Sequence, residues 1–448
     1  MCEHKTNPSI YMNDNDTLFP IPESIKNDNS DKFSSAKPRL KTPIRNQVEI
    51  TIESLDECLA EDHKARSVWA YVEQFDLSSI LLKIKSVESA PGAPAIDPRI
   101  LIALWLYAFI EGIISAKMIN RYCKEHKAFK WLCGGVSVNE HTISDFRSNN
   151  GDAFDELLTQ SIGVLSHQGL ITIDRIAQDG MKVRAHAGRS SFRRKETLKA
   201  HLKMAQDHIE SLKKEFTENP SAISAKQAAA KKRGAEEREK RTKQALIELE
   251  KLSKQKKKAF KVRCKSFTAK DKEKVRASKT DPEARIMKMP NSGFDPAYNV
   301  QLATDTKSKV IVGVEVVQAG NDYGQLGPMK KQVEARLGYS IPEILADPGF
   351  LDYKDVEEAS KTSNLYIPSE TITGTNEKYP AVNEMKKRME TAEAKKIYKE
   401  RASTAEFVNA RVRTRGLTQF SVTGLEKVQA VTLIFAIAQN MLVWISNL

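Results

Sequence analysis

The sequence has few of the features that mark secreted or membrane proteins. Its cysteines are odd in number and irregularly spaced, which argues against a disulfide framework; they are Cys2, Cys58, Cys123, Cys133 and Cys264. No basic-then-apolar signal segment opens the chain. The longest apolar run, 100–110, has 11 residues, about half the length that a bilayer helix needs. These absences predict a cytoplasmic protein with reduced thiols and no membrane span.

Several common catalytic signatures are missing too. All eight histidines lie at or before His208, which disfavours a Ser-His-Asp hydrolase in the second half of the chain, although His141 or His186 could still fold into it. Neither G-x-x-x-x-G-K-[ST] nor G-x-G-x-x-G occurs, so no nucleotide cofactor is expected. Four potential zinc ligands cluster in sequence, but their spacing fits no regular zinc module and favours packing in a helical bundle; they are Cys123, His126, Cys133 and His141.

What the chain has in excess is positive charge, and one segment supplies it. The whole chain carries 71 basic and 58 acidic residues, a net of +13. Residues 189–280 alone hold 29 basic and 12 acidic residues, a net of +17, which leaves the remainder at −4. A polyanion such as nucleic acid is the expected partner of this segment. A solvated, charged helix that binds nothing is the alternative.

The composition of this basic segment predicts long helices. It contains one glycine and one proline in 92 residues and is dense in Ala, Lys, Glu and Leu, which are good helix formers. We expect a coiled-coil-like insert of two long helices, folded back near Asn219 and Pro220 or joined around Gly234.

Upstream of the insert the sequence indicates a tail and then a helical region. Residues 1–47 are rich in Asn, Asp, Ser and Lys, with scattered prolines, and predict a disordered tail. In 48–167, Asp97 and Pro98 form a helix start before the apolar run. A helix at 115–127, a glycine turn and a helix ending near Arg147 follow helix-turn-helix order. The region is therefore a candidate DNA-binding domain, with simple bundle packing as the alternative.

Around the insert, the periodicity predicts an α/β fold. Strands are expected at 170–179, 298–305, 310–317, 341–346 and 364–368, and helices at 325–337 and 352–361. Helices dominate from 384 onward; the apolar span 428–445 carries Gln439 and Asn440 and suits a buried core helix. This order predicts a mixed sheet flanked by helices, formed by 168–188 and 281–448.

Two acidic residues occupy predicted strand ends. Asp179 closes the first strand and Asp347 closes the fourth. If these strands are neighbours, the carboxylates converge and can bridge one or two divalent cations, the arrangement used in two-metal phosphoryl transfer. Hard oxygen ligands favour Mg²⁺ or Mn²⁺. Asp-Gly and Asp-Pro-Gly are also ordinary turn formers, which is the alternative interpretation.

Several ordered motifs resemble the bacterial insertion-sequence DDE transposases. They span the chain from about residue 95 to the carboxyl end and comprise the runs at 97–101, 131–132, 141–147, 179–187, 280–285, 298–301, 345–350, 398–401 and 404–410. The resemblance implies an RNase H-like catalytic core, split by a helical insert and preceded by a helical amino-terminal domain. The resemblance also implies that this core binds metal through a triad of Asp, Asp and Glu.

In this sequence Asp179 matches the first acid of the triad, Asp347 the second and Glu406 the third. The match at the third acid departs from the family pattern, because Arg413 stands where many members carry Lys, and Ala405 precedes the Glu where Val is common. Glu400 and Glu393 are the alternatives for the third acid, and a surface ion pair is the alternative role of Glu406. Since Glu406 and Arg413 are seven residues apart, a helix places them on one face.

The resemblance further implies a transposase that uses two Mg²⁺ or Mn²⁺ ions to cut double-stranded DNA at the transposon ends and join it to target DNA. A homodimer on DNA in the bacterial nucleoid is the expected assembly. The candidate DNA-contacting residues are Arg147, Lys182, Arg184, Tyr398, Arg401 and Arg413. A non-catalytic DNA-binding protein, or an inactive relative, is the alternative function.

Overall fold

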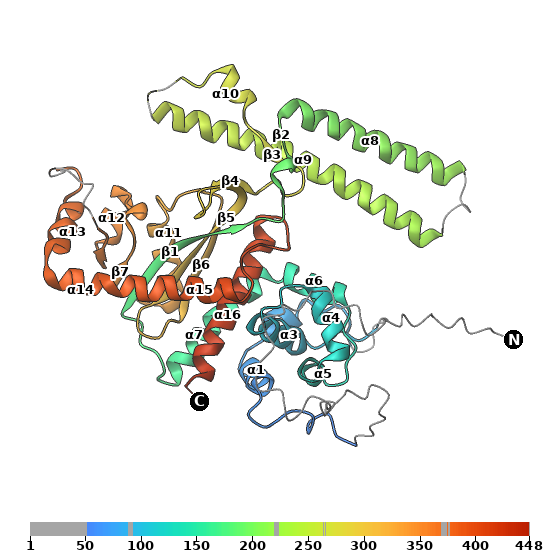
Figure 1. Cartoon of the computed structure of the whole chain (residues 1–448), viewed down its shortest axis with the longest axis horizontal. Coiled ribbons are helices and arrows are strands. Elements are labelled where there is room, and N and C mark those ends of the chain that lie inside the picture. The colour runs from blue at the N-terminus through green and yellow to red at the C-terminus, as the bar shows by residue number, and fades with distance from the viewer. Residues whose placement is uncertain are drawn as a thin grey trace, which may run out of the picture. The chain divides into compact units, whose positions relative to one another are not determined.

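The computed structural model describes residues 52–87, 93–218, 224–262, 264, 266–368, 374 and 377–447 (Figure 1). The predicted tail at 1–47 lies outside these residues. Mixed α/β structure with an amino-terminal helical region is confirmed.

The amino-terminal region is helical, as expected. Its elements are α1 (Lys64–Val72), α2 (Ser78–Leu81), α3 (Pro98–Ile110), α4 (Ala116–Glu125), α5 (Lys127–Cys133), α6 (Glu140–Asn149) and α7 (Gly151–His167). The Asp97 side chain accepts a hydrogen bond from the Arg99 backbone N–H and so caps α3. Every α3 residue from Pro98 to Phe109 except Arg99 is buried, so the apolar run is a core helix.

The predicted mixed sheet is confirmed. Its strands are β1 (Arg175–Arg184), β4 (Arg285–Lys288), β5 (Phe294–Asp305), β6 (Ile311–Val317), β7 (Glu343–Leu345) and β8 (Asn364–Tyr366). The central order is β6-β5-β1-β7-β8, in which β5 is antiparallel to β6 and β1, whereas β1, β7 and β8 are parallel. β4 pairs with the first residues of β5. The strands of Asp179 and Asp347 are therefore neighbours.

One strand end differs from its prediction. Asp179 lies in the middle of β1, which continues to Arg184 because β5 pairs with it throughout. Pairing with β7, however, stops at Ala177. Asp179 therefore still lies where β1 and β7 diverge, two residues beyond their last pair.

The remaining helices pack around the sheet. They are α11 (Leu326–Leu337), α12 (Tyr353–Ala359), α13 (Pro380–Glu390), α14 (Ala392–Arg401), α15 (Phe407–Thr414) and α16 (Leu425–Ile445), and a π-helical turn, Ala402–Glu406, joins α14 to α15. A methyl group on Gly313 of β6 would lie 2.5 Å from the Met329 sulfur and 2.7 Å from Val333. The absence of a side chain at this position lets α11 approach the sheet closely.

α16 is a core helix of the fold. By length and composition it could cross a membrane, but 83% of its apolar window is buried within the fold. Asn440 bonds both the backbone N–H and the carbonyl of Ile311 on β6, at 2.8 and 2.9 Å. Phe435 stacks on Phe109 of α3 with ring centroids 4.0 Å apart. The helix therefore joins the amino-terminal helices and the sheet in one hydrophobic core.

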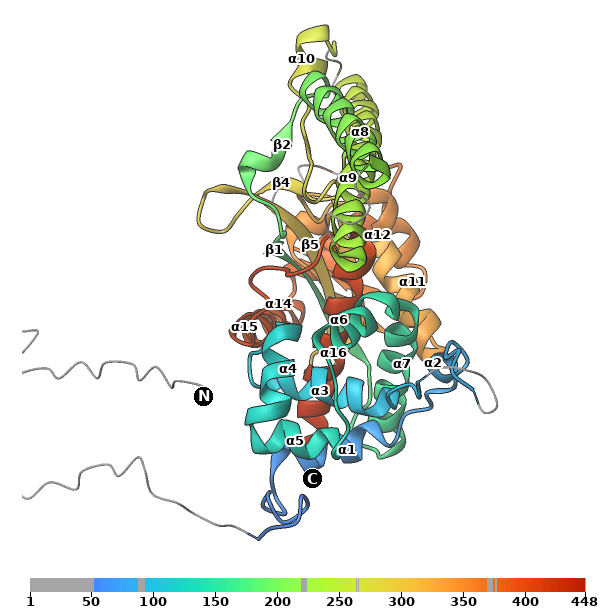
Figure 2. The same ribbon diagram turned by 90° about the vertical axis from the view of Figure 1, so that its right-hand side faces the viewer.

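The basic insert contains the two long helices that its composition predicts. α8 (Lys195–Glu218) and α9 (Ala225–Val262) lie side by side in both views (Figures 1 and 2). α9 continues through Gly234, so the predicted joining point at Gly234 is wrong; the other, near Asn219 and Pro220, lies outside the described residues. The insert also has a short helix, α10 (Ala269–Glu273), and the strands β2 (Phe192–Arg193) and β3 (Ala277–Ser278), which pair with each other.

A buried ion pair anchors the insert to the sheet. Arg285 of β4 donates to Glu248 of α9 at 2.6 Å, and the two side chains are 10% and 2% exposed. Lys251 contacts the same carboxylate at 2.7 Å. The position of α9 is therefore coupled to β4.

Candidate active site at the β1–β7 edge

The two predicted aspartates meet across a single guanidinium group. Asp179 projects from β1, and Asp347 follows β7, where its Oδ1 accepts a hydrogen bond from the Gly349 backbone N–H at 2.8 Å. Nη2 of Arg401, at the end of α14, lies 3.1 Å from Asp179 Oδ1 and 3.5 Å from Asp347 Oδ2. Two carboxylates thus flank one position occupied by positive charge.

Asp179 is the more buried of the pair. Its side chain is 17% exposed, against 33% for Asp347. Burial raises the pKa of Asp179, the charge of Arg401 lowers it, and the charges of Asp347 and Asp322 raise it further. Its second oxygen, Oδ2, accepts a hydrogen bond from Asn409 of α15 at 2.8 Å. Asn409 was not singled out from the sequence, although it lies within the motif at 404–410.

This donor set fits a divalent cation. Carboxylate oxygens from neighbouring strands are the hard ligands that Mg²⁺ and Mn²⁺ prefer. The Arg401 guanidinium already places a positive charge between the two carboxylates. Within the described residues, however, no three His, Cys, Asp or Glu side chains are grouped closely enough to form a ready-made metal centre.

The predicted third acid does not join the pair in this structure. Glu406 is exposed and ends the π-helical turn. Asn409, three residues later, contacts Asp179, and residues three apart are neighbours on a helix. Glu406 therefore lies about one helical turn from a residue that contacts Asp179, but among the described residues it makes no contact with either aspartate itself.

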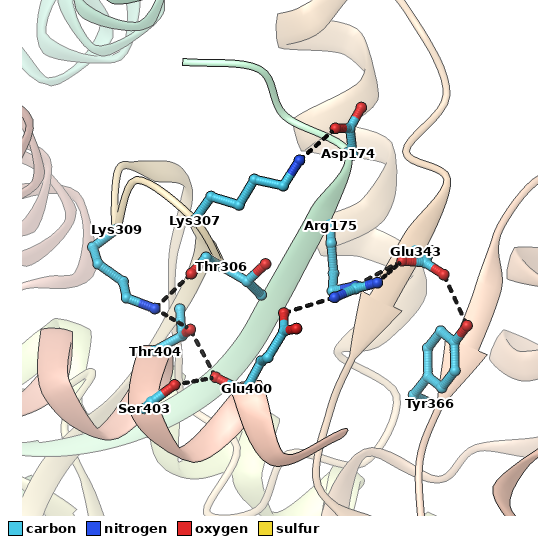
Figure 3. Close-up of polar contacts among 10 residues, drawn as sticks. All are labelled: Asp174, Arg175, Thr306, Lys307, Lys309, Glu343, Tyr366, Glu400, Ser403 and Thr404. Carbon is cyan, nitrogen blue, oxygen red and sulfur yellow. Dashed lines mark hydrogen bonds and ion pairs between the residues drawn. The ribbon is translucent and has the colours of Figure 1, made fainter. Parts of the chain in front are cut away.

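The fallback candidates for the third acid lie elsewhere. Glu393 is exposed in the first turn of α14. Glu400 binds Arg175 at 2.7 Å, and the same guanidinium binds Glu343 of β7 at 2.6 Å (Figure 3). Arg175 thereby fixes α14 to the starts of β1 and β7.

A second contact fixes the π-helical turn. Lys309, in the β5–β6 connection, donates to Thr404 Oγ1 at 2.7 Å, and Thr404 Oγ1 donates to the Glu400 carbonyl at 2.8 Å (Figure 3). π-helical turns insert one residue into a helix and occur frequently at functional sites. Here the anchored turn sets the rotation of Glu406 and Asn409 relative to Arg401.

Three predicted DNA-contacting residues line one hollow. Lys182, Arg184 and Arg413 surround a depression of about 250 Å³ at the end of β1, together with residues of the 289–291 and 417–419 loops. The backbone of 418–420 pairs with Arg184. We call this depression the β1 groove. It begins three residues along β1 from Asp179.

The other three candidates have different surroundings. Arg401 binds the aspartates, and Tyr398 is partly buried beside it; burial raises the tyrosine pKa, which the Arg401 charge opposes. Arg147 is only 4% exposed, and its guanidinium lies 4.4 Å from the Trp105 ring centroid. Burial lowers the Arg147 pKa to about 10. Because this side chain is in the core, we do not include it in the proposed DNA interface.

Comparison with protein families identifies two matched regions. The family described as Transposase domain (DUF772) matches residues 53–149, and the family described as Transposase DDE domain matches residues 368–444. The second match covers the segment that carries Arg401, Glu406 and Asn409. A search of curated proteins and a search of solved structures gave no significant match.

Proposed function

We propose that this chain, which belongs with the insertion-sequence DDE transposases, is a metal-dependent enzyme that cuts DNA at the ends of its element and joins them to target DNA. The observation that carries the proposal is the convergence of Asp179 and Asp347 across one positively charged position. The family match alone does not show that this chain is catalytic, because one fold can carry different functions. The carboxylate pair supplies the chemistry.

The proposed reaction has two phosphoryl-transfer steps. In the first, a water oxygen attacks phosphorus at the element end and the bond to the 3′ oxygen breaks, which leaves a 3′-hydroxyl. In the second, that hydroxyl attacks a target phosphate, and the target strand's own 3′ oxygen leaves. Two Mg²⁺ or Mn²⁺ ions, held by Asp179, Asp347 and Glu406, would activate the attacking oxygen and stabilise the leaving one.

The chain's own cations then have distinct roles. Arg401 balances the negative charge of the two aspartates. Lys182, Arg184 and Arg413 of the β1 groove would bind phosphates next to the reacting one and orient the strand. We assign element-end recognition to the amino-terminal helical region, 48–167, within which the transposase-domain family matches 53–149. Because two ends must be joined, a dimer on DNA is the proposed assembly.

The variant Asp347→Ala tests the catalytic proposal. With DNA that carries the element's own ends and with Mg²⁺ or Mn²⁺, we expect nicking by the wild type and none by the variant, whereas both shift the same DNA in a gel. Equal nicking by both proteins would assign the cleavage to another site or to a contaminant. Binding without nicking by either protein would favour the non-catalytic DNA-binding alternative.

We further propose that the insert supplies much of the salt-sensitive DNA affinity. A hollow of about 720 Å³ lies between α8, α9 and α10, and five lysines line it together with three glutamates. We call it the lysine hollow; its lysines are Lys195, Lys199, Lys254, Lys257 and Lys272. Phosphate contacts by such side chains release counterions, so the affinity falls with salt concentration.

The double variant Lys254→Ala/Lys257→Ala is expected to weaken DNA binding and to flatten its salt dependence. If both lysines contact phosphates, the slope of log K against log salt becomes less steep by about 1.8, since each contact contributes about 0.9. Fluorescence anisotropy at several salt concentrations measures this slope. Lys331→Ala/Lys354→Ala, at exposed lysines of α11 and α12, is the matched control. An unchanged slope in the insert variant would exclude this role for the lysine hollow.

A further inference from the structure

A third carboxylate lies beside the aspartate pair, in the connection between β6 and α11. Oδ1 of Asp322 accepts hydrogen bonds from the Asn299 amide at 2.8 Å and from the Gln301 amide at 2.5 Å. Both amides belong to β5, the strand next to β1. Asp322 itself is partly exposed. The sheet therefore holds this acidic side chain in one orientation.

The amide side chains that hold Asp322 in place are buried, which costs free energy unless they are hydrogen-bonded. Asn299, Gln301 and Gln178 are at most 1% exposed. Gln178 of β1 donates to the Gln301 side-chain oxygen at 3.3 Å and to the Gln325 carbonyl at 2.9 Å. Polar groups in a sheet interior cost free energy unless they are bonded. Here Gln178 and Gln301 form a chain of hydrogen bonds that ends on Asp322, and Asn299 donates to the same carboxylate oxygen.

One atom of this support lacks a partner. Oδ1 of Asn299 is buried and has no hydrogen-bond partner within the described part of the chain. It belongs to the same amide group that holds Asp322. A buried carbonyl oxygen without a donor is rare and calls for a ligand or water. An oxygen of this kind is also a suitable neighbour for a hydrated divalent cation.

Two glycines show how close Asp322 comes to the aspartate pair. A methyl group on Gly180, which follows Asp179, would lie 2.0 Å from Asp322 Oδ1. A methyl group on Gly349, whose N–H binds Asp347, would lie 2.9 Å from Asp347 Oδ1 and 4.0 Å from Asp322 Oδ2. Oxygens of Asp347 and Asp322 thus border the same small space. Glycine leaves this space open at both positions.

The two oxygens of Asp347 therefore have different surroundings. Oδ2 faces Arg401 and, across it, Asp179. Oδ1 faces Gly349 and the space that Asp322 Oδ2 borders. Successive side chains of a strand point to opposite faces, so Asp322 approaches β1 on the face of Gly180, whereas Arg401 and Asn409 approach on the face of Asp179. Asp347 lies beyond the end of β7, with one oxygen toward each group.

We propose that Asp322 is a further metal ligand of this site and binds one divalent cation together with Asp347, while Asp347 also binds the other cation, together with Asp179 and Glu406. The inference rests on the proposed function, which it extends from the predicted acids to a residue in the β6–α11 connection. It also explains why the sheet interior keeps three amides at this point. Asn299 and Gln301 act as positioning residues for Asp322.

Manganese binding by the full-length protein tests the proposal without DNA or turnover. The free Mn²⁺ signal in electron paramagnetic resonance gives the number of bound ions and their affinity. We expect the wild type to bind two ions. In Asp322→Asn the affinity for one of them should fall by about tenfold or more, since even indirect partners of metal ligands contribute about 10- to 100-fold. In Asp347→Asn the affinity for both ions should fall. Asp174→Asn, at a half-exposed acid paired with Lys307, is the matched control and should bind like the wild type.

A second variant separates the position of Asp322 from its charge. Gly180→Ala keeps every carboxylate but places a methyl group where Asp322 lies, so the same ion should bind more weakly. Circular dichroism confirms that each variant is folded. Wild-type binding by a folded Asp322→Asn would overturn the inference and leave the proposed function intact if Asp347→Asn still loses its ions. No Mn²⁺ binding by the wild type would overturn both.

Discussion

Replacing Asp179 by asparagine is expected to abolish metal-dependent strand cleavage while leaving DNA binding intact. The substitution removes a metal ligand but keeps the shape of the side chain and its ability to accept the Asn409 hydrogen bond. Loss of an indirect partner costs about 10- to 100-fold, so loss of a direct ligand should reduce cleavage by at least about 100-fold. Cleavage of end DNA and gel shifts on the same samples measure the two properties.

The same variant should be more stable than the wild type in EDTA at neutral pH. Burial raises the folded-state pKa of Asp179, and Asp347 and Asp322 add to this against Arg401. A carboxyl group whose folded pKa is raised makes the free energy of unfolding fall as pH rises from its unfolded pKa, 3.8, through its folded pKa. Above that range the ionised group is unfavourable, and neutral asparagine removes this cost.

Thermal melting of wild type and Asp179→Asn at several pH values checks the sign. The higher melting temperature of Asp179→Asn should be present at pH 7 and should vanish toward pH 3, where the aspartate is protonated in both the folded and the unfolded state. Asp174→Asn, at a half-exposed acid just before the start of β1, should change neither cleavage nor this pH dependence. Cleavage by Asp179→Asn within twofold of the wild type would exclude Asp179 from the metal site.

The second large effect concerns stability, at the ion pair between Glu248 and Arg285. Replacing Arg285 by methionine leaves Glu248, whose side chain is 2% exposed, with only the exposed Lys251 as a charged partner among the described residues. Breaking a buried pair by removing one partner costs about 3–5 kcal/mol. We expect the free energy of unfolding in urea to fall by this amount, with faster proteolysis within α8 and α9, since the pair joins α9 to β4.

Two further variants make this prediction specific. Lys195→Ala removes an exposed pair with Glu250 between the same two insert helices, for which about 0–1 kcal/mol is expected. The double variant Glu248→Leu/Arg285→Met leaves no buried charge and should recover much of the loss. A change of less than about 1 kcal/mol in Arg285→Met would mean that the pair does not hold the insert in place.

Local patterns in the sequence were enough to predict most of the fold. The alternation at 298–305 and 310–317 predicts the hairpin of β5 and β6, and Asp97 with Pro98 predicts the start of α3. The predicted extent of β1 is wrong, because the alternating pattern was taken to end at Asp179, whereas the strand continues to Arg184. Its actual length is set by pairing with β5, a partner more than 100 residues away, and a local pattern does not contain that information.

The site could be predicted only where its residues belong to motifs. Asp179 and Asp347 were expected to converge, and they do. The domain boundaries and the role of Glu406 stay predictions. Arg147 is buried because its helix packs on Trp105, which tertiary structure decides. Asp322 carried no signal of its own, but Asn299 and Gln301 did, as polar residues at alternating, buried positions in the middle of β5.

The most direct test of the account is a single reaction with wild-type protein, DNA that carries the element's own ends, and a target plasmid, in Mg²⁺ and in EDTA. Sequencing of the products maps any new 3′ ends and junctions. We predict Mg²⁺-dependent breaks at the element ends and covalent joining of those 3′ ends to target DNA. Binding of the ends with neither breaks nor junctions, in a folded protein that binds Mn²⁺, would contradict the assignment as an active transposase.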